Sequence, residues 1–317
     1  LIKNFCHGAF FHNLSYLFLN RKNTPLEKLL WRIVSDGSER FDTHFDLAVS
    51  YIEGGSAYYV HDHVSAAKKA AFVHVDYVQA GYTRRLDKDC YVDFDRIFAV
   101  SDETAGVLAG VYPECQQKLS VFHNLIDTEA IRQKALLPAE KSMHEGIRLL
   151  TVGRLTPQKG FDCAVYALKL LLEKQYPVYW YIIGEGPEYG RLTQLARSLH
   201  VEDHFIFLGM QTNPYPYFKM ADFYIHATRF EGKSIAIQEA QVLGCAIAAS
   251  DCSGNREQIV SGVDGLLCPF SPEGIANAVE YLIEHPQTAQ SFGKAAAQKA
   301  CHFENDIHMI RDLLYSP

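Results

Sequence analysis

The sequence of 317 residues lacks several features that would assign it to a class at once. With 37 acidic and 30 basic side chains its formal net charge is −7, which excludes the strongly basic balance of a protein whose main partner is nucleic acid. No apolar run approaches the ~18 residues that a membrane-spanning helix requires. The first residues also lack the layout of a signal peptide.

The eight cysteines form no CxxC pair and no Cys/His spacing of the kind that binds zinc. Cys163 and Cys245 lie inside apolar segments, where a free cysteine behaves as a small hydrophobic residue. We therefore expect reduced thiols in a cytoplasmic protein.

Short apolar runs without polar alternation recur along the chain, and helical stretches separate them. Such runs are typical of strands buried on both faces, and therefore of a parallel sheet. Their alternation with helices predicts βαβ units, and a polar stretch at 138–146 divides them into two doubly wound domains. The expected strands are 46–51, 71–75, 96–101, 119–124, 148–152, 178–183, 205–208, 223–226, 246–249 and 265–267.

Ligands of doubly wound sheets bind at the loops that follow the strands, so these loops are the candidate site. Arg154 and Lys159 follow one strand, next to Gly153 and Gly160. A planar guanidinium and a mobile ammonium together suit a phosphate, although an ordinary basic turn is the alternative. Gly184, after the next strand, indicates a close backbone approach or simply a structural turn.

Two glutamates, Glu231 and Glu239, are separated by seven residues after the strand 223–226. The intervening segment from Gly232 to Ser234 leads into a helix, whose free N–H groups favour an anion such as a diphosphate. Glu239 lies in an otherwise apolar helix, where a buried carboxylate needs a partner such as ribose hydroxyls. A surface glutamate on an amphipathic helix is the alternative.

In this order the loops resemble retaining glycosyltransferases of family 4, in group 1, which have the GT-B fold of two Rossmann-like α/β domains facing a cleft. The resemblance is clear from about residue 147 onward and weaker over about 45–124. It rests on Gly153-Arg154, Lys159-Gly160, Gly184–Pro187, Phe207–Gly209, Glu231-Gly232, Glu239-Ala240, Glu257, Gly262 and Gly265.

The resemblance implies a role for each matching residue. Arg154 and Lys159 would hold the donor diphosphate and stabilise the departing nucleotide. Glu231 would lie beside the donor sugar, and Glu239 would hold the ribose. His74, in the matching segment 71–76, would contact the donor sugar from the first domain; a structural histidine is the alternative. The remaining donor-binding residues implied are Gly153, Gly184, Gly209, Met210, Gly232, Lys233 and Ser234, with the loop at 209–210 against the base.

The implied reaction transfers a sugar, with retention, from a nucleotide-diphosphate sugar to a glycan, lipid-linked or other hydroxyl acceptor in polysaccharide or glycolipid synthesis. UDP is expected as the commoner nucleotide. No metal or other cofactor is expected, because cations and helix N-termini stabilise the leaving group. A nucleotide-sugar-binding module without transfer activity and a sugar-nucleotide epimerase are the alternatives.

The basic cluster of Lys68, Lys69, Arg84, Arg85 and Lys88 suggests contact with the inner face of an anionic membrane; a solvated face is the alternative.

The expected organisation is an acceptor-side domain at 1–143, a nucleotide-sugar-binding domain at 144–301, and a last helix at 302–317 that crosses back to the first domain. The family's usual opening strand and glycine-rich loop are not recognisable in the first domain, so we expect it to be incomplete at its N-terminal part. Two Asp-x-Asp pairs, Asp87/Asp89 and Asp93/Asp95, imitate a metal motif, but they precede a strand and are interpreted as solvated surface carboxylates.

Overall fold

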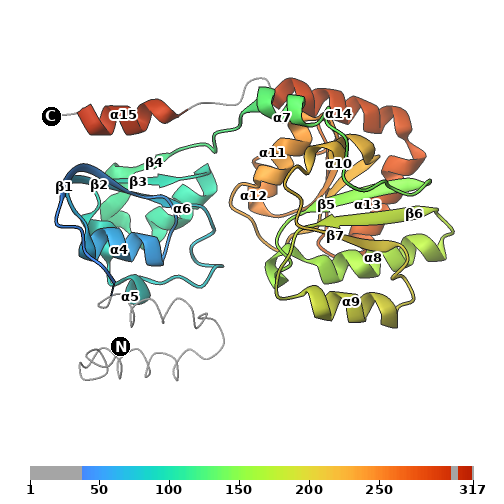
Figure 1. Ribbon diagram of the computed structural model, residues 1–317, viewed down its shortest axis with the longest axis horizontal. Coiled ribbons are helices and arrows are strands. Elements are labelled where there is room, and N and C mark those ends of the chain that lie inside the picture. The colour runs from blue at the N-terminus through green and yellow to red at the C-terminus, as the bar shows by residue number, and fades with distance from the viewer. Residues whose placement is uncertain (1–37, 301–305, 316–317) are drawn as a thin grey trace. The chain divides into compact units, whose positions relative to one another are not determined.

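The computed structural model describes residues 38–300 and 306–315, which belong to two compact units (Figure 1). The first unit comprises Leu1–Asn124 and Asn305–Pro317, and the second comprises Leu125–Glu304. We expected the division at residue 143. The structure places it after Asn124, because helix α7 (Thr128–Lys134) packs on the second unit, where Ile131 joins an apolar cluster with Val242 and Ala300.

The first unit contains a four-stranded parallel sheet with the strands in sequence order. Within the described residues each strand pairs with its neighbours in the chain, and helices fill the connections. The strands are β1 (His44–Ser50), β2 (Ser65–Val73), β3 (Arg96–Ala99) and β4 (Leu119–Val121). The helices are α4 (Gly55–His63), α5 (Arg84–Asp87) and α6 (Asp102–Val111), with 3-10 turns at Cys90–Asp93 and Pro113–Lys118.

The last helix, α15 (Ile307–Tyr315), belongs to the first unit although 180 residues of the second unit precede it. Its Leu313 joins an apolar cluster with Phe72 and Phe98 on the sheet, and Lys68 Nζ donates to the Leu313 carbonyl at 3.1 Å. Just before the helix, the Asp306 carboxylate accepts hydrogen bonds from the amide and the Nδ1 of His123, each at 2.7 Å. Packing and polar contacts therefore hold this segment to the first sheet.

The second unit contains a six-stranded parallel sheet in the order β10-β9-β8-β5-β6-β7. The chain runs outward from β5 to β7, returns to β8 beside β5, and then runs outward on the other side. This arrangement makes the carboxyl ends of β5 and β8 a topological switch point. The strands are β5 (Ile147–Val152), β6 (Val178–Ile183), β7 (Phe205–Gly209), β8 (Phe223–His226), β9 (Ala246–Ser250) and β10 (Leu266–Cys268).

Apolar side chains on both faces of this sheet explain the continuous apolar runs in the sequence. Consecutive residues of a strand point to opposite faces, so Leu149 and Trp180 enter one core while Leu150 and Tyr181 enter the other. In Figure 1, α8 and α9 lie along one face of the sheet, and α10 and α11 along the other. The helices are α8 (Phe161–Glu173), α9 (Tyr189–Ser198), α10 (Tyr215–Met220), α11 (Ile235–Val242), α12 (Ser253–Arg256), α13 (Pro272–Glu284) and α14 (Pro286–Ala300).

Two parallel α/β sheets confirm the predicted fold class, and a strand forms at each of the ten predicted positions. Over 38–300 and 306–315, no helix combines the length and the hydropathy needed to cross a membrane.

The interpretation of the Asp-x-Asp pairs as solvated is wrong for Asp87. This side chain is completely buried and accepts hydrogen bonds from the hydroxyls of Tyr58 and Tyr77. Its aromatic surroundings were not evident from the sequence because Tyr58 lies 29 residues away.

Candidate functional site

The loops that follow β5, β6 and β7 are joined by backbone hydrogen bonds at the carboxyl edge of the second sheet. The Gly153 amide donates to the Ile183 carbonyl at 2.9 Å, and the Gly184 amide donates to the Gly209 carbonyl at 3.0 Å. Gly184 has φ +139°, and a Cβ there would lie 2.0 Å from the Gly153 carbonyl oxygen. This glycine is therefore required for loop-against-loop packing.

The loops that follow β5 and β8 are also joined, and this contact brings together residues far apart in sequence. Gln158 Nε2 donates to the Phe230 carbonyl at 3.0 Å, and the Arg229 amide donates to the Gln158 carbonyl at 2.9 Å. The Arg229 guanidinium binds both carboxylate oxygens of Asp162, at 3.0 and 2.7 Å. These contacts place Lys159 beside Glu231 at the switch point.

Lys159 and Glu231 form an ion pair in which both side chains are largely buried, with 16% and 11% of their surfaces exposed. Burial alone would raise the pKa of Glu231. The His226 ring and the Lys159 ammonium outweigh burial and hold that pKa at about 2. Glu231 is therefore an anion at neutral pH, already paired with a cation that a phosphate could also bind.

His226, at the end of β8, lies beneath this pair and was not identified from the sequence. Its ring is 2% exposed, with Nε2 at 3.4 Å from Glu231 Oε2 and Nδ1 at 3.2 Å from the Tyr224 hydroxyl. Burial, supplemented by the Lys159 charge, lowers the pKa of His226, so the ring is neutral at pH 7. The available signal was a histidine that ends a strand five residues before Glu231.

Arg154 lies in the same loop as Lys159, but its side chain is exposed. No hydrogen bond or ion pair engages its guanidinium within 38–300 and 306–315. An unpaired guanidinium in the same loop as a buried ammonium suits the binding of a diphosphate.

The segment between the two glutamates is held tightly against the neighbouring loop. Gly232 is buried, and its carbonyl oxygen lies so close to the next loop that a Cβ on Gly254 would be only 2.2 Å from it. Ser234 caps α11, since its hydroxyl accepts from the Ile237 amide at 3.4 Å. The earlier amides of the first turn have no carbonyl within the helix to bond, so they are suited to an anion. Lys233 lies in this segment and is partly exposed.

Glu239, one turn further along α11, is partly buried and accepts a hydrogen bond from the Tyr215 hydroxyl at 2.9 Å. Burial raises the pKa of Glu239 above its ordinary value, and the hydrogen bond from Tyr215 opposes this shift. Glu239 is therefore engaged by the neighbouring helix α10.

A cavity of about 510 Å³ opens beside the loops after β6 and β7. Gly184 and Gly209 contribute backbone to its wall. Tyr189 and Phe207 also line it, and their rings pack edge to face with centroids 5.1 Å apart. Its size and aromatic walls suit a planar base. Met210, directly after Gly209, is 71% exposed and does not line the cavity.

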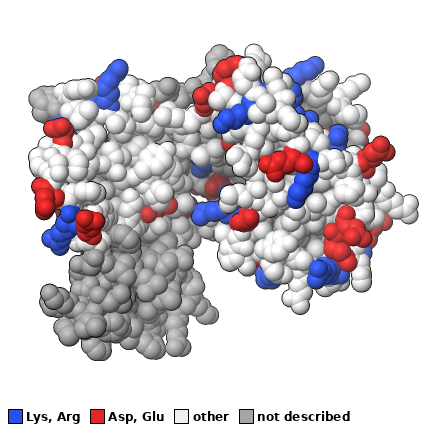
Figure 2. Space-filling view, in the orientation of Figure 1, with Lys and Arg blue, Asp and Glu red and all other residues white. Residues whose placement is uncertain are grey.

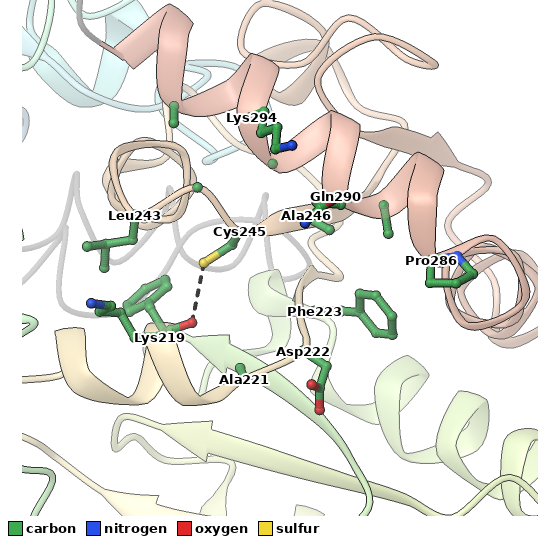
Figure 3. Close-up of a pocket in the computed structure, with 15 residues that line it drawn as sticks. Lys219, Ala221, Asp222, Phe223, Leu243, Cys245, Ala246, Pro286, Gln290 and Lys294 are labelled. Carbon is green, nitrogen blue, oxygen red and sulfur yellow. Dashed lines mark hydrogen bonds between the residues drawn. The ribbon is translucent and has the colours of Figure 1, made fainter.

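A second cavity of about 510 Å³ lies at the other end of the same sheet (Figure 3). Phe223 and Ala246, at the amino ends of β8 and β9, bound this cavity together with α14. In its wall the Cys245 thiol donates a hydrogen bond to the Phe218 carbonyl at 3.5 Å. None of the predicted site residues lines this cavity, so it is separate from the site at the carboxyl ends.

His74 lies in the first unit, directly after β2, and its amide donates to Glu53 Oε2 at 2.9 Å. Burial would raise the pKa of Glu53, but its bonds from His74 lower it below the usual range. The ring of His74 packs beside Tyr51 and Phe72, and its Nδ1 lies 3.7 Å from Glu53 Oε2.

The basic cluster of the first unit does not form one open patch. Lys68 is bound to α15, Lys69 donates to the His61 carbonyl, and Arg84 pairs with Asp89 and Glu114.

On the face shown in Figure 2, basic and acidic side chains are interspersed over the second unit. Among the side chains that the structure describes, no three His, Cys, Asp or Glu residues gather as a metal site would require.

The fold and the site together define a class: a two-domain α/β protein with paired cations and carboxylates at the switch point of its second sheet. Residues 132–299, just over half of the chain, match the model of the family described as glycosyl transferases group 1. The chain belongs to this family.

The similar curated proteins include a Campylobacter jejuni enzyme named N-acetylgalactosamine-N,N'-diacetylbacillosaminyl-diphospho-undecaprenol 4-alpha-N-acetylgalactosaminyltransferase. It is 30% identical over 200 residues, which cover 62% of this chain and 53% of that protein. An uncharacterized glycosyltransferase of Methanocaldococcus jannaschii is 25% identical over 180 residues, which cover 55% and 42% of the two chains. The chain thus spans about half the length of these relatives.

Solved structures of GT-B glycosyltransferases share the fold. Anabaena HepE in complex with UDP-glucose matches with a TM-score of 0.71 and 17% identity over 92% of this chain and 83% of that one. A glycosyltransferase from Rickettsia africae matches with a TM-score of 0.70 and 18% identity over 92% and 81% of the two chains.

Proposed function

We propose that this glycosyltransferase is a metal-independent, retaining enzyme that transfers a sugar from a UDP-sugar to a hydroxyl of a glycan or lipid-linked acceptor. The buried Lys159–Glu231 pair at the switch point, with Glu239 on the following helix, is the observation that carries the proposal. It combines a cation for phosphate, a carboxylate for the sugar and a carboxylate for the ribose within one group of loops.

In this proposal the residues act mainly by electrostatics. Arg154 and Lys159 bind the diphosphate and offset the negative charge that grows as the sugar–phosphate bond breaks. The backbone from Gly232 to Ser234 and the first turn of α11 bind the same anion. Glu231 faces the donor sugar, and Glu239 binds the ribose. The cavity beside Gly209 accommodates the base.

Three assignments reach beyond the second unit. His74 contacts the donor sugar from the first unit. The name of the Campylobacter relative contains a diphospho-undecaprenol-linked sugar, which supports a lipid-linked glycan as acceptor and a role in cell-surface glycan synthesis. The enzyme works in the cytoplasm, with peripheral contact at the inner face of the membrane.

The first experiment titrates the protein with UDP and with GDP by calorimetry, alongside Glu239→Ala. Glu202→Ala is the matched control, because Glu202 is an exposed glutamate outside the site. We expect micromolar binding of UDP, weaker binding of GDP, and a loss of about tenfold or more for Glu239→Ala, as a lost charged hydrogen bond would cause. Equal UDP affinity in the unchanged protein, Glu239→Ala and Glu202→Ala would refute the donor site.

Turnover separates the enzyme from a binding module. With a UDP-sugar and an acceptor panel, we expect a product of unchanged anomeric configuration by NMR and the same rate in EDTA as with Mn²⁺. UDP binding without any transfer or hydrolysis would favour the binding module, and an isomerised sugar without acceptor would favour an epimerase.

A further inference from the structure

The Tyr215 hydroxyl is the group that orients the Glu239 carboxylate. Tyr215 begins α10, after the loop that follows β7, and its hydroxyl lies 2.9 Å from Glu239 Oε1 on α11. The two residues come from different helices on the same face of the second sheet. Their contact therefore depends on how α10 and α11 pack.

The Tyr215 ring itself is held in place by apolar contacts. The ring packs against the core cluster between the sheet and α11, and its centroid lies 6.5 Å from that of the Phe218 ring. It also packs against the cluster that contains Ile131 and Val242. A ring fixed on several sides can direct its hydroxyl to one place, which a flexible surface side chain cannot.

The chemistry of the pair gives the hydroxyl only one role. Burial, reinforced by the neighbouring Glu239 charge, raises the pKa of Tyr215 to about 12, so the phenol stays protonated at neutral pH. It therefore donates to the carboxylate. One donor occupies one of about four lone-pair positions of a carboxylate, which leaves acceptor positions for two further hydroxyls.

We propose that Tyr215 is a positioning residue that presents the Glu239 carboxylate to the ribose hydroxyls of the nucleotide donor, an inference that rests on the ribose-binding role proposed above for Glu239. A carboxylate already held in its binding orientation loses less side-chain freedom when the ribose arrives, so the interaction with the diol is stronger. Tyr215 itself need not touch the nucleotide.

The alternative is that Tyr215 only fills the core. In that case Tyr215→Phe would alter stability, but it would change the affinities for nucleotides with and without a ribose hydroxyl by the same factor. The ratio of two affinities measured on one protein is independent of the folded fraction, because both ligands bind the same folded molecules.

The experiment measures UDP and 2′-deoxy-UDP binding by calorimetry to the full chain, to Tyr215→Phe and to Tyr217→Phe. Tyr217 is the matched control on the same helix: its buried hydroxyl donates to Gln211 Oε1 at 3.4 Å and accepts from the Lys141 amide at 3.0 Å, away from Glu239. Each substitution removes a single hydroxyl and keeps the ring.

We expect the unchanged chain to prefer UDP over 2′-deoxy-UDP by about tenfold, which is the scale of one hydrogen bond to a charged group. Tyr215→Phe should weaken UDP binding and reduce this preference to about twofold or less, whereas Tyr217→Phe should keep it. If Tyr215→Phe keeps the full preference, the positioning role is refuted and the donor site stands. If the unchanged chain binds both ligands equally, the ribose role of Glu239 fails and this inference fails with it.

Discussion

Removal of the Glu231 carboxylate should lower the stability of the second unit. The substitution Glu231→Gln keeps the size of the side chain but removes its charge. It leaves the Lys159 ammonium largely buried without its counter-ion, and the His226 ring without a charged neighbour. Breaking a buried pair on one side is costly because the remaining charge stays desolvated.

The magnitude follows from the pKa of Glu231, which falls from an ordinary 4.5 to about 2 in the folded protein. At about 1.4 kcal/mol for each tenfold change in proton affinity, the ionised form contributes about 3 kcal/mol to stability. Because the folded pKa is the lower one, this contribution is complete above pH 4.5 and is lost as the pH falls toward 2. At pH 3 less than half of the ~3 kcal/mol should remain.

The assay is urea unfolding at pH 7, 5, 4 and 3, followed by tryptophan fluorescence, since Trp180 is fully buried in the core of the second unit. We expect the unchanged protein to be more stable than Glu231→Gln by about 3 kcal/mol at pH 7 and 5, with a difference that shrinks at pH 4 and 3. Glu202→Gln should show no difference at any pH. A Glu231 difference below about 1 kcal/mol, or one independent of pH, would refute the reasoning.

Three further predictions use the same protein. Arg154→Ala should leave the thermal midpoint unchanged, because its side chain is exposed and has no partner within 38–300 and 306–315, but should weaken UDP binding by about tenfold in calorimetry. Gly184→Ala should lower the unfolding free energy by more than about 2 kcal/mol in urea, since its Cβ would meet the Gly153 carbonyl oxygen at 2.0 Å; a neutral result would contradict the packing. Asp306→Ala should speed amide exchange across α15 by at least about tenfold, with the second unit unaffected, because both hydrogen bonds from His123 are lost; unchanged exchange would mean that apolar packing and the Lys68 hydrogen bond hold the helix without Asp306.

Much of the fold could be predicted because its signal is local. A strand buried on both faces must be apolar at consecutive positions, and Leu149-Leu150 and Trp180-Tyr181 show this directly in the sequence. The order of strands and helices then leaves few topologies, and ligand-binding loops must follow the strands. Arg154, Lys159, Glu231 and Glu239 are selected by this rule, because each lies in or just beyond such a loop.

The partners of these side chains could not be predicted, because they depend on contacts between distant segments. Lys159 meets Glu231 across 72 positions, and Tyr215 meets Glu239 across 24. No local pattern records such a contact, since many residues of suitable chemistry lie at similar separations. The burial of Asp87 among tyrosines and the packing of α7 on the second unit were missed for the same reason.

The sequence alone therefore determined the parallel α/β architecture and which loops carry charge, because hydrophobic period and loop position are properties of short segments. Only the tertiary structure decided which charges are paired, buried or free. It placed Glu231 between a cation and a neutral histidine, left Arg154 exposed, and held Glu239 by a tyrosine, since pairing and desolvation arise only when segments far apart in the chain are packed together.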